Sequence, residues 1–345
     1  MKPLISILLL ISILGCERVQ TDNHEITIES AIDHYADKLL KDSRFHSVSI
    51  GVYKGGESLT KHYGELEIGK GNAPTDQSFY ELGSVTKIFT GMLAAKAVLD
   101  KKIGLDDDVR KYLHKDYPNL EFNGSPVRIK HLLTHTSNFP NFPIKGDNKA
   151  VYFEGLDEID ITSEPGSEYF YSNTAPELTA FILETVYEKP YDDLLQEFIL
   201  NAQNMNDTAF VSDIVQLVKG YNGDGELMPN FERKLWGGAV GLNSTASDLL
   251  KFIKLQLDDS NDVVSESHKN LFQINKSLSV GYHWYISKEG NTLRYSHHGG
   301  IYGMQNWLVI YPEYDIGISV ISNASFDGVG DSLEKVATGI FGRIK

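Results

Sequence analysis

The sequence predicts an α/β protein of the α+β type, in which both ends of the chain build one antiparallel sheet and a mainly helical region is inserted between them. Apolar residues alternate near the N-terminus, the middle is helical and rich in loops, and the last third returns to strands joined by short turns. Short connections require neighbouring strands to run antiparallel. The segment NWLVIY at 306–311 is apolar on both faces, so we expect helices on both sides of the sheet.

The first fifteen residues, MKPLISILLLISILG, predict an export signal. They carry one positive charge and an apolar run that is too short to span a bilayer. The only cysteine follows in ILGC at 13–16, which resembles a bacterial lipobox and implies lipidation of Cys16. The protein would then be exported and held on a bacterial membrane, on the periplasmic or cell-surface side. An ordinary secretory signal with a chance cysteine is the alternative.

After the signal peptide at 1–15 and a tether at 16–24, one domain is expected over 25–345. Its α/β part comprises 25–105 and 236–345, and its helical part comprises 106–235. In chain order, the expected elements are a helix at 25–42, a hairpin at 48–64, a helix from Ser84 towards Gly104, helical segments at 128–137, 174–188 and 191–200, strands at 280–287, 292–300, 304–312 and 315–322, and a helix from Gly328.

Composition excludes several classes of protein. With 41% hydrophobic residues, the 345-residue chain can bury a large core. A formal charge of −15 and the lack of a basic stripe argue against nucleic acid as a partner. No segment after the signal is long enough to span a membrane.

The stretch ELGSVTKIFTG at 81–91 places Ser84 and Lys87 three residues apart at the start of a predicted helix, where they share a face. The positive end of the helix dipole and the apolar neighbours Ile88 and Phe89 would lower the pKa of Lys87. An amine beside a hydroxyl can activate a serine nucleophile without a histidine.

The Ser-x-x-Lys pattern alone is weak, because it occurs twice more. Ser58 and Lys61 fall in a predicted strand, where side chains three apart point to opposite faces. Ser332 and Lys335 fall in the last helix, in a solvated acidic setting. Only the pair at Ser84 has the apolar surroundings that the chemistry needs.

A second motif is EPGSEYFYSNTAPE at 164–177. Tyr171 in the loop before a helix can point into a cleft, and a neighbouring ammonium would lower its pKa towards that of a usable base. Asn173 offers both a hydrogen-bond donor and an acceptor. The plainer interpretation makes Asn173 a helix cap.

A third motif is YSHHGGIYGM at 295–304. Two glycines after two histidines in a strand suggest close backbone approach by a ligand. Adjacent strand residues face opposite sides, and no Asp, Glu or Cys lies nearby to complete a zinc site. We therefore expect neither a metal nor another cofactor.

The three motifs, in this order, resemble the serine β-lactamase and penicillin-binding protein superfamily, in particular its class C-like branch. HLLTHTSNFP at 131–140 and WGGAVGLNSTASDLLKF at 236–252 also resemble segments of that branch, so the likeness covers most of residues 45–325. It implies a β-lactamase/transpeptidase-like fold and a reaction through an acyl-enzyme.

The resemblance also implies a role for each motif residue. Ser84 would be the nucleophile, Lys87 its activating amine, Tyr171 the general base, and Asn173 a ligand of the substrate amide. His297-His298-Gly299 would replace the Lys-Thr-Gly of the edge strand, with His297 and Gly299 binding substrate; the register 298–300 is the rival. The backbone N–H groups of Ser84 and Gly300 would form the oxyanion hole.

A histidine in place of that lysine is mostly uncharged at neutral pH, so a β-lactam carboxylate loses part of its anchor. We therefore expect an exported serine hydrolase whose substrate is a small molecule or peptide: a D-amino-acid peptide of the peptidoglycan type, or a small ester or amide. A true class C-like β-lactamase and a non-catalytic surface-lipoprotein binding module are the alternatives.

Overall fold

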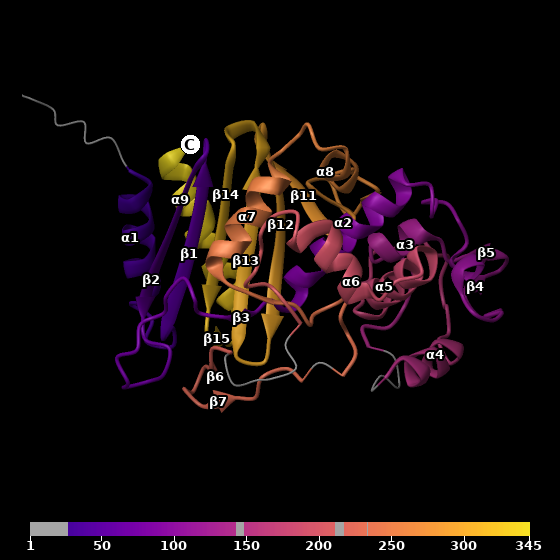
Figure 1. The fold of residues 1–345 in the computed structure, drawn as a ribbon, viewed down its shortest axis with the longest axis horizontal. Helices are drawn as coiled ribbons and strands as arrows, with labels where there is room; N and C mark the ends of the chain where they lie inside the picture. The colour runs from indigo at the N-terminus through magenta and orange to yellow at the C-terminus, as the bar shows by residue number, and fades with distance from the viewer. Residues whose placement is uncertain (1–26, 143–147, 211–216, 233) are drawn as a thin grey trace, which may run out of the picture.

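The computed structural model describes residues 27–142, 148–210, 217–232 and 234–345. Its centre is an eight-stranded sheet in the order β2-β1-β14-β13-β12-β11-β10-β9, in which every neighbouring pair is antiparallel (Figure 1). The strands are β1 (Ser47–Lys54), β2 (Glu57–Gly64), β9 (Phe272–Gln273), β10 (Leu278–Gly281), β11 (Trp284–Glu289), β12 (Thr292–Ile301), β13 (Met304–Tyr311) and β14 (Ile316–Ser322). Because β1 pairs with β14, both ends of the chain build one sheet, as predicted.

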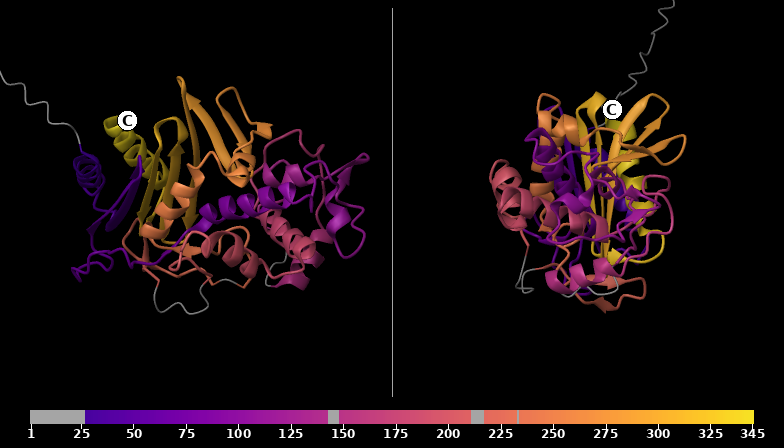
Figure 2. Two further views of the ribbon diagram at one scale, coloured as in Figure 1. Left: turned by 45° about the horizontal axis from the view of Figure 1, so that its top comes forward. Right: turned by 90° about the vertical axis from the view of Figure 1, so that its right-hand side faces the viewer.

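Helices cover both faces of the sheet (Figures 1 and 2). On one face, α1 (Ile28–Leu39) and α9 (Val329–Ile344) form a core with apolar residues of β1, β13 and β14. On the other, α7 (Ala246–Gln256) lies on β1 and β14, and α2 (Thr86–Leu99) packs against α8 (Asp262–Ser267). In β1, Ile50 faces the α1 side, while a Cβ on Gly51 would lie 3.0 Å from Leu250 of α7. Burial on both faces explains why the inner strands lack polar alternation.

The middle of the chain forms the predicted helical region. Its helices are α3 (Ile129–Leu133), α4 (Lys149–Asp157), α5 (Thr174–Tyr187) and α6 (Tyr191–Leu195), the last followed by a π-helical turn at Gln196–Leu200. The small strands are β3 (Tyr80–Glu81), β4 (Glu121–Phe122), β5 (Ser125–Pro126), β6 (Gly220–Asn222), β7 (Leu227–Met228), β8 (Asn243–Ser244) and β15 (Ala324–Ser325). Pairing of β3 with β8 ties the strand before Ser84 to the segment that leads into α7.

The predicted bounds of two elements were wrong. The predicted strand at 280–287 breaks into β10 and β11, because Tyr282 and His283 adopt left-handed conformations with φ of +49° and +70°. The break lets this turn approach α2 so closely that a Cβ on Gly91 would collide with the backbone oxygen of Tyr282. The helix at Ser84 also begins differently, since a 3₁₀ turn, η1 (Gly83–Val85), precedes α2, and α2 ends at Leu99.

The two other Ser-x-x-Lys pairs lie where the sequence places them. Ser58 and Lys61 are on β2, where Lys61 forms ion pairs with Glu29 and Asp33 of α1. Ser332 is in the first turn of α9 and donates a hydrogen bond to the Gly328 backbone oxygen. Neither pair has the lysine bonded to its serine in the described structure.

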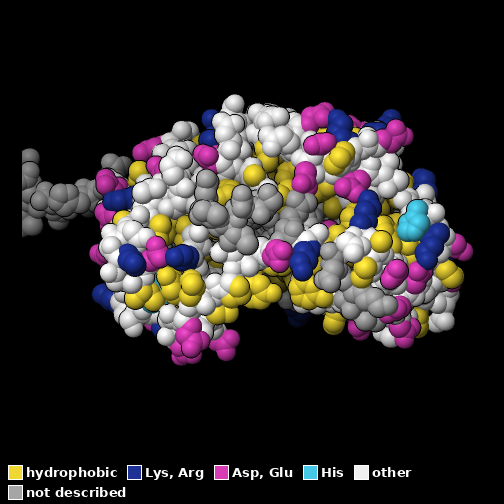
Figure 3. All heavy atoms as spheres, turned by 60° about the horizontal axis from the view of Figure 1, so that its bottom comes forward, with side chains coloured by type: hydrophobic (Ala, Val, Ile, Leu, Met, Phe, Trp, Pro, Cys, Tyr) yellow, Lys and Arg dark blue, Asp and Glu magenta, His cyan; other side chains and the backbone are white. Residues whose placement is uncertain are grey.

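Figure 3 shows one face of the molecule, on which Lys and Arg side chains are separated by acidic and apolar ones. The predicted signal peptide, the predicted tether and Cys16 lie outside the described residues. Within the described ranges, no helix is both long and apolar enough to cross a membrane.

Candidate active site

Ser84 lies in the η1 turn between β3 and α2, and it is partly exposed although its neighbours are buried. The turn requires a glycine at position 83, where φ is +52°. A Cβ on Gly83 would lie 2.7 Å from the backbone oxygen of Gly300 and 3.0 Å from its nitrogen. Position 83 thus allows the Ser84 turn to pack directly on β12.

Two side chains from different elements meet at the Ser84 hydroxyl. Lys87 Nζ, one turn further along α2, lies 2.9 Å from Ser84 Oγ, and the Tyr171 hydroxyl donates to the same oxygen at 2.7 Å. The structure therefore brings together the three residues that the sequence proposed as catalytic.

Lys87 is fully buried, and its amine makes two further contacts. Nζ donates to Asn173 Oδ1 at 2.6 Å and to the Ala239 backbone oxygen at 2.9 Å. Burial lowers the pKa of Lys87 well below its usual value, and the negative charge of Glu177 opposes that shift only in part. The expected lowering of this pKa is confirmed, with burial as its main cause.

The pKa of Tyr171 moves against expectation. Burial raises the pKa of Tyr171 above its usual value, while the hydrogen bond with Ser84 lowers it by less. Lys87 Nζ lies 5.0 Å from the Tyr171 ring, but a buried amine with a strongly lowered pKa supplies little positive charge. The predicted lowering was therefore wrong, and the phenol is protonated at neutral pH.

Asn173 occupies the N-cap position of α5, but its side chain makes no capping bond. Its Oδ1 accepts from Lys87, and its Nδ2 donates to Asn141 Oδ1 at 2.7 Å. The Asn173 backbone N–H also donates to the Asn141 backbone oxygen at 2.8 Å. Asn173 therefore serves the site rather than the end of the helix.

Sequence reasoning missed three contributors to this arrangement. Asn141 orients Asn173, Ala239 offers a backbone oxygen to Lys87, and the buried carboxylate of Glu177 accepts from the Gly238 N–H at 2.9 Å. Every residue has a backbone carbonyl, so nothing in the sequence marks Ala239. Glu177 and Gly238 do lie inside segments that carried the family resemblance.

The two histidines of β12 point to opposite faces, as predicted. His297 is buried, its Nδ1 lies 2.7 Å from the His298 backbone oxygen, and its ring centroid is 5.4 Å from that of Tyr285. His298 lies on the other side, where its Nε2 is 2.6 Å from Gln305 Oε1. Burial lowers the pKa of His297 to about 3, so this histidine is neutral.

The glycine after these histidines allows the chain to approach itself. A Cβ on Gly299 would collide with the Leu82 backbone oxygen, which also accepts from Asn306 Nδ2 at 2.8 Å. At Gly299, the backbone of β12 therefore approaches Leu82, the residue before the Ser84 turn. Within the described ranges, no cluster of three or more His, Cys, Asp or Glu residues could hold a metal ion.

A partly exposed serine that is hydrogen-bonded to a buried amine and a phenol, in a turn packed beside a sheet with helices on both faces, is the arrangement expected of a serine hydrolase. The family model described as Beta-lactamase matches residues 32–338, and the chain belongs to that family. Among curated proteins, it is 24% identical to the D-alanyl-D-alanine-carboxypeptidase/endopeptidase AmpH of Escherichia coli strain K12, over 90% of this chain and 89% of that protein. It is 25% identical to Protein flp of Staphylococcus aureus strain MRSA252, over 93% of this chain and 67% of that protein.

Solved structures share the fold. A β-lactamase/D-alanine carboxypeptidase from Yersinia pestis, complexed with citrate, matches with a TM-score of 0.82 and 22% identity, over 92% of this chain and 99% of the other. A class C β-lactamase matches with a TM-score of 0.82 and 20% identity, over 94% and 98% of the two chains. The predicted β-lactamase/transpeptidase-like fold is confirmed.

Proposed function

We propose that this serine hydrolase forms an acyl-enzyme on Ser84 and acts on a D-amino-acid peptide of the peptidoglycan type or on a small ester or amide. One observation carries the proposal: Lys87 Nζ is buried and contacts the Ser84 hydroxyl together with two oxygens that can only accept hydrogen bonds, Asn173 Oδ1 and Ala239 O.

This arrangement sets the direction of the lone pair on a neutral Lys87 amine. A neutral amine has two N–H bonds, and the oxygens of Asn173 and Ala239 take both of them. The lone pair then faces Ser84 Oγ at 2.9 Å. The raised pKa of Tyr171 and the lowered pKa of Lys87 favour the amine as acceptor of the serine proton in the free enzyme.

The reaction divides into two acyl transfers. Ser84 Oγ forms a bond to the substrate carbonyl carbon while its proton passes to Lys87. The bond to the leaving group then breaks, and that group takes a proton from the Tyr171 hydroxyl, which Lys87 restores. In the second transfer, water loses a proton to the same pair, its oxygen bonds the acyl carbon, and Ser84 regains its proton as the ester bond breaks.

Negative charge develops on the carbonyl oxygen in both transfers. The backbone N–H groups of Ser84 and Gly300 are the proposed donors. The close packing of Gly83 on Gly300 supports this assignment, because it keeps the two backbone segments together before substrate binds.

The choice of substrate rests on the charge of β12. His297 is neutral where penicillin-hydrolysing relatives carry lysine, so the described site offers no fixed cation at this position for a β-lactam carboxylate. The likeness to an Escherichia coli D-alanyl-D-alanine-carboxypeptidase/endopeptidase supports a peptide substrate. His297 and Gly299 would line the substrate along β12, and Asn173 would bind its amide.

Covalent capture tests the nucleophile and the substrate class. A fluorophosphonate probe and a labelled penicillin are added separately to the wild-type protein, to Ser84→Ala and to Lys87→Ala. We expect the phosphonate to label the wild type on the peptide containing Ser84 and to label neither variant at a comparable rate. Penicillin is expected to label slowly, if at all, and to be released slowly.

The other outcomes discriminate between functions. Rapid release of hydrolysed penicillin would make the protein a β-lactamase. No adduct with either probe, in protein shown to be folded by circular dichroism, would favour a binding module without catalysis. Mapping of the adduct to Ser58 or Ser332 would overturn the assignment of Ser84.

We further propose that the protein is exported and anchored through lipidated Cys16. Intact-mass analysis of protein extracted from membranes should give a mature chain that starts at Cys16 and carries added acyl mass. A water-soluble mature chain with another N-terminus would reject the anchor. Cys16→Ala provides the matched control, since it should remove the acyl mass without altering the hydrolase domain.

A further inference from the structure

His135 holds the segment that carries Tyr171. It follows α3, is fully buried, and has a left-handed φ of +56°. Its backbone oxygen accepts from the Phe170 N–H at 2.7 Å, and its ring Nδ1 accepts from the Ser172 N–H at 3.3 Å. The amides on both sides of Tyr171 are therefore bonded to one histidine.

The ring of His135 also contacts Tyr171 itself. The two ring centroids are 4.6 Å apart, with an angle of 31° between the planes. The Tyr171 hydroxyl at the far end of that ring donates to Ser84 Oγ at 2.7 Å. The two backbone bonds and the ring contact together restrict where this hydroxyl can lie.

These contacts require a neutral His135. Nδ1 can accept from Ser172 only while its lone pair is free, whereas both ring nitrogens of an imidazolium are donors. Burial lowers the pKa of His135 well below its usual value, and His283 is the next largest cause. The titratable groups that face it from the elements around it are Tyr169, Tyr171, His283, Lys87 and His297.

The ring of His283 packs against the ring of His135. His283 is also fully buried, and its ring centroid lies 5.0 Å from that of His135. The backbone N–H of His283 donates to the Leu133 backbone oxygen at 3.0 Å. The left-handed turn that interrupts the expected strand therefore places His283 against His135.

We propose that His135, in its neutral form, is a positioning residue that fixes the Tyr171 hydroxyl on Ser84; the proposal rests on the proposed function, since it assumes that Tyr171 takes part in proton transfer. His135 does not touch Ser84 in the described contacts and acts through Tyr171. Removing its side chain lowers kcat rather than raising KM, because the reacting geometry is lost while the substrate surface is kept.

The test compares His135→Gly, which removes the ring, with His135→Asn, whose Oδ1 can replace Nδ1 as acceptor. Both residues tolerate the left-handed backbone. We expect His135→Gly to lower kcat about 10²-fold on an ester substrate, and His135→Asn to recover activity to within about tenfold of the wild type.

His268→Asn is the matched control. His268 is a histidine whose ring stacks on a tyrosine, Tyr295, at a centroid distance of 4.2 Å, and its Nε2 lies 3.0 Å from Gln256 Oε1. Burial lowers the pKa of His268 to about 4, as at other buried histidines. This variant should keep the wild-type kcat; a loss equal to that of His135→Gly would mean a general packing effect and overturn the proposal.

Amide hydrogen exchange gives a readout that needs no substrate. In His135→Gly, the Ser172 amide should exchange faster than in the wild type, and His135→Asn should restore its protection. Unchanged protection in His135→Gly would overturn the proposal. Failure of the fluorophosphonate to label the wild type would reject the proposed function instead, and the exchange data would still decide whether His135 holds the Tyr171 segment.

Discussion

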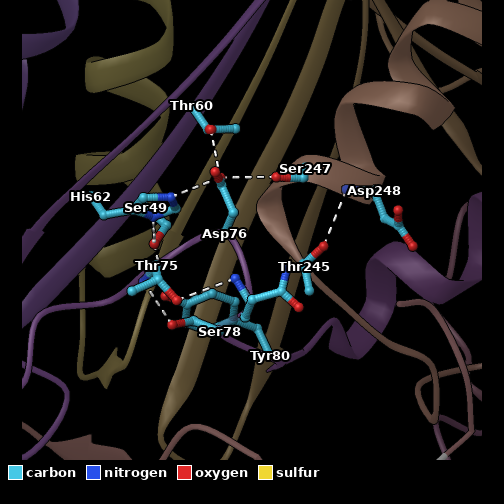
Figure 4. A network of polar contacts seen from close by, with 11 residues as sticks. Ser49, Thr60, His62, Thr75, Asp76, Ser78, Tyr80, Thr245, Ser247 and Asp248 are labelled. Carbon is cyan, nitrogen blue, oxygen red and sulfur yellow. Dashed lines mark hydrogen bonds and ion pairs between the residues drawn. The ribbon is translucent and has the colours of Figure 1, made fainter. Parts of the chain in front are cut away.

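The hydrogen-bond networks around Ser84 and Ser49 differ in access to solvent. At Ser84, a lysine and a tyrosine meet a partly exposed hydroxyl. At Ser49 of β1, Oγ lies 2.8 Å from His62 Nδ1, and His62 Nε2 lies 3.0 Å from Asp76 Oδ1 (Figure 4). The second network has the residue types and the order of a Ser-His-Asp triad, yet Ser49 is fully buried.

The surroundings of Ser49 make it unsuited to act as a nucleophile. Its Oγ also lies 2.7 Å from the Tyr80 hydroxyl, which is itself buried. Burial raises the pKa of Asp76, but hydrogen bonds from Thr60, His62 and Ser247 outweigh that effect and leave the pKa below its usual value. The network joins β1, β2 and the start of α7 (Figure 4), so its role is structural. A nucleophile needs an exposed oxygen and nearby oxyanion donors as well as a base.

The largest expected difference between the networks is in turnover. Ser84→Ala should lower kcat by roughly 10⁴–10⁶-fold, as removal of a nucleophile does in other serine hydrolases. Ser49→Ala should leave kcat within about twofold of the wild type, because no substrate reaches that hydroxyl. Steady-state kinetics on one ester substrate measure both. Equal losses in the two variants would contradict the distinction.

The tyrosines Tyr171 and Tyr80 give a second test of the difference between the two networks. Tyr171→Phe should lower kcat by about 10²–10⁴-fold, the usual contribution of a proton-transfer group, with the fold unchanged. Tyr80→Phe removes the matching hydroxyl from Ser49 and should leave kcat unchanged. Circular dichroism spectra confirm folding in each case. If Tyr171→Phe keeps full activity, proton transfer uses another group.

The Ser49 network should matter for the stability of the fold rather than for turnover. Ser49→Ala removes the partner of His62 Nδ1 and one of the partners of the Tyr80 hydroxyl, and should lower the free energy of unfolding by about 1–3 kcal/mol. Ser58→Ala, on the exposed part of β2, should change it by no more than about 0.5 kcal/mol. Urea denaturation measures both variants. A Ser49→Ala protein as stable as the wild type would show that the network does not support the fold.

The last expected effect concerns pH. Burial lowers the pKa of His131 and His268 to about 4, whereas an unfolded histidine titrates near 6.5. The unfolded chain therefore binds more protons below pH 6.5, so stability is full above that pH and falls as the pH drops towards 4. Urea midpoints at several pH values measure the slope. His268→Asn should make the slope shallower, and an unchanged slope would mean that His268 does not titrate as described.

Much of the fold could be predicted from local pattern. The hairpin formed by β1 and β2 follows from its alternation and its Lys-Gly-Gly-Glu turn, and its register also sets Ser49 opposite His62. The break at Tyr282 and His283 could not be predicted, because those residues rarely adopt left-handed conformations. The turn packs against Gly91, which is distant in sequence.

At the site, side-chain chemistry was predictable and backbone chemistry was not. Ser84, Lys87 and Tyr171 carry reactive groups in marked patterns, so the sequence identifies them. The oxygen of Ala239 and the orientation of Asn141 are visible only in three dimensions. The pKa of Tyr171 was predicted in the wrong direction because burial of Tyr171 itself raises it, and the sequence does not show that burial.

The contacts of Lys87 also make the activation of Ser84 depend on folding of the whole site. The amine is held by Asn173 and Ala239, and the Ser84 turn rests on Gly300, so groups from four distant parts of the chain must meet before the serine is activated. A chain still emerging from the ribosome lacks the later parts and carries an inert serine. Reactivity would thus begin only once these parts of the chain have been synthesised and have folded together.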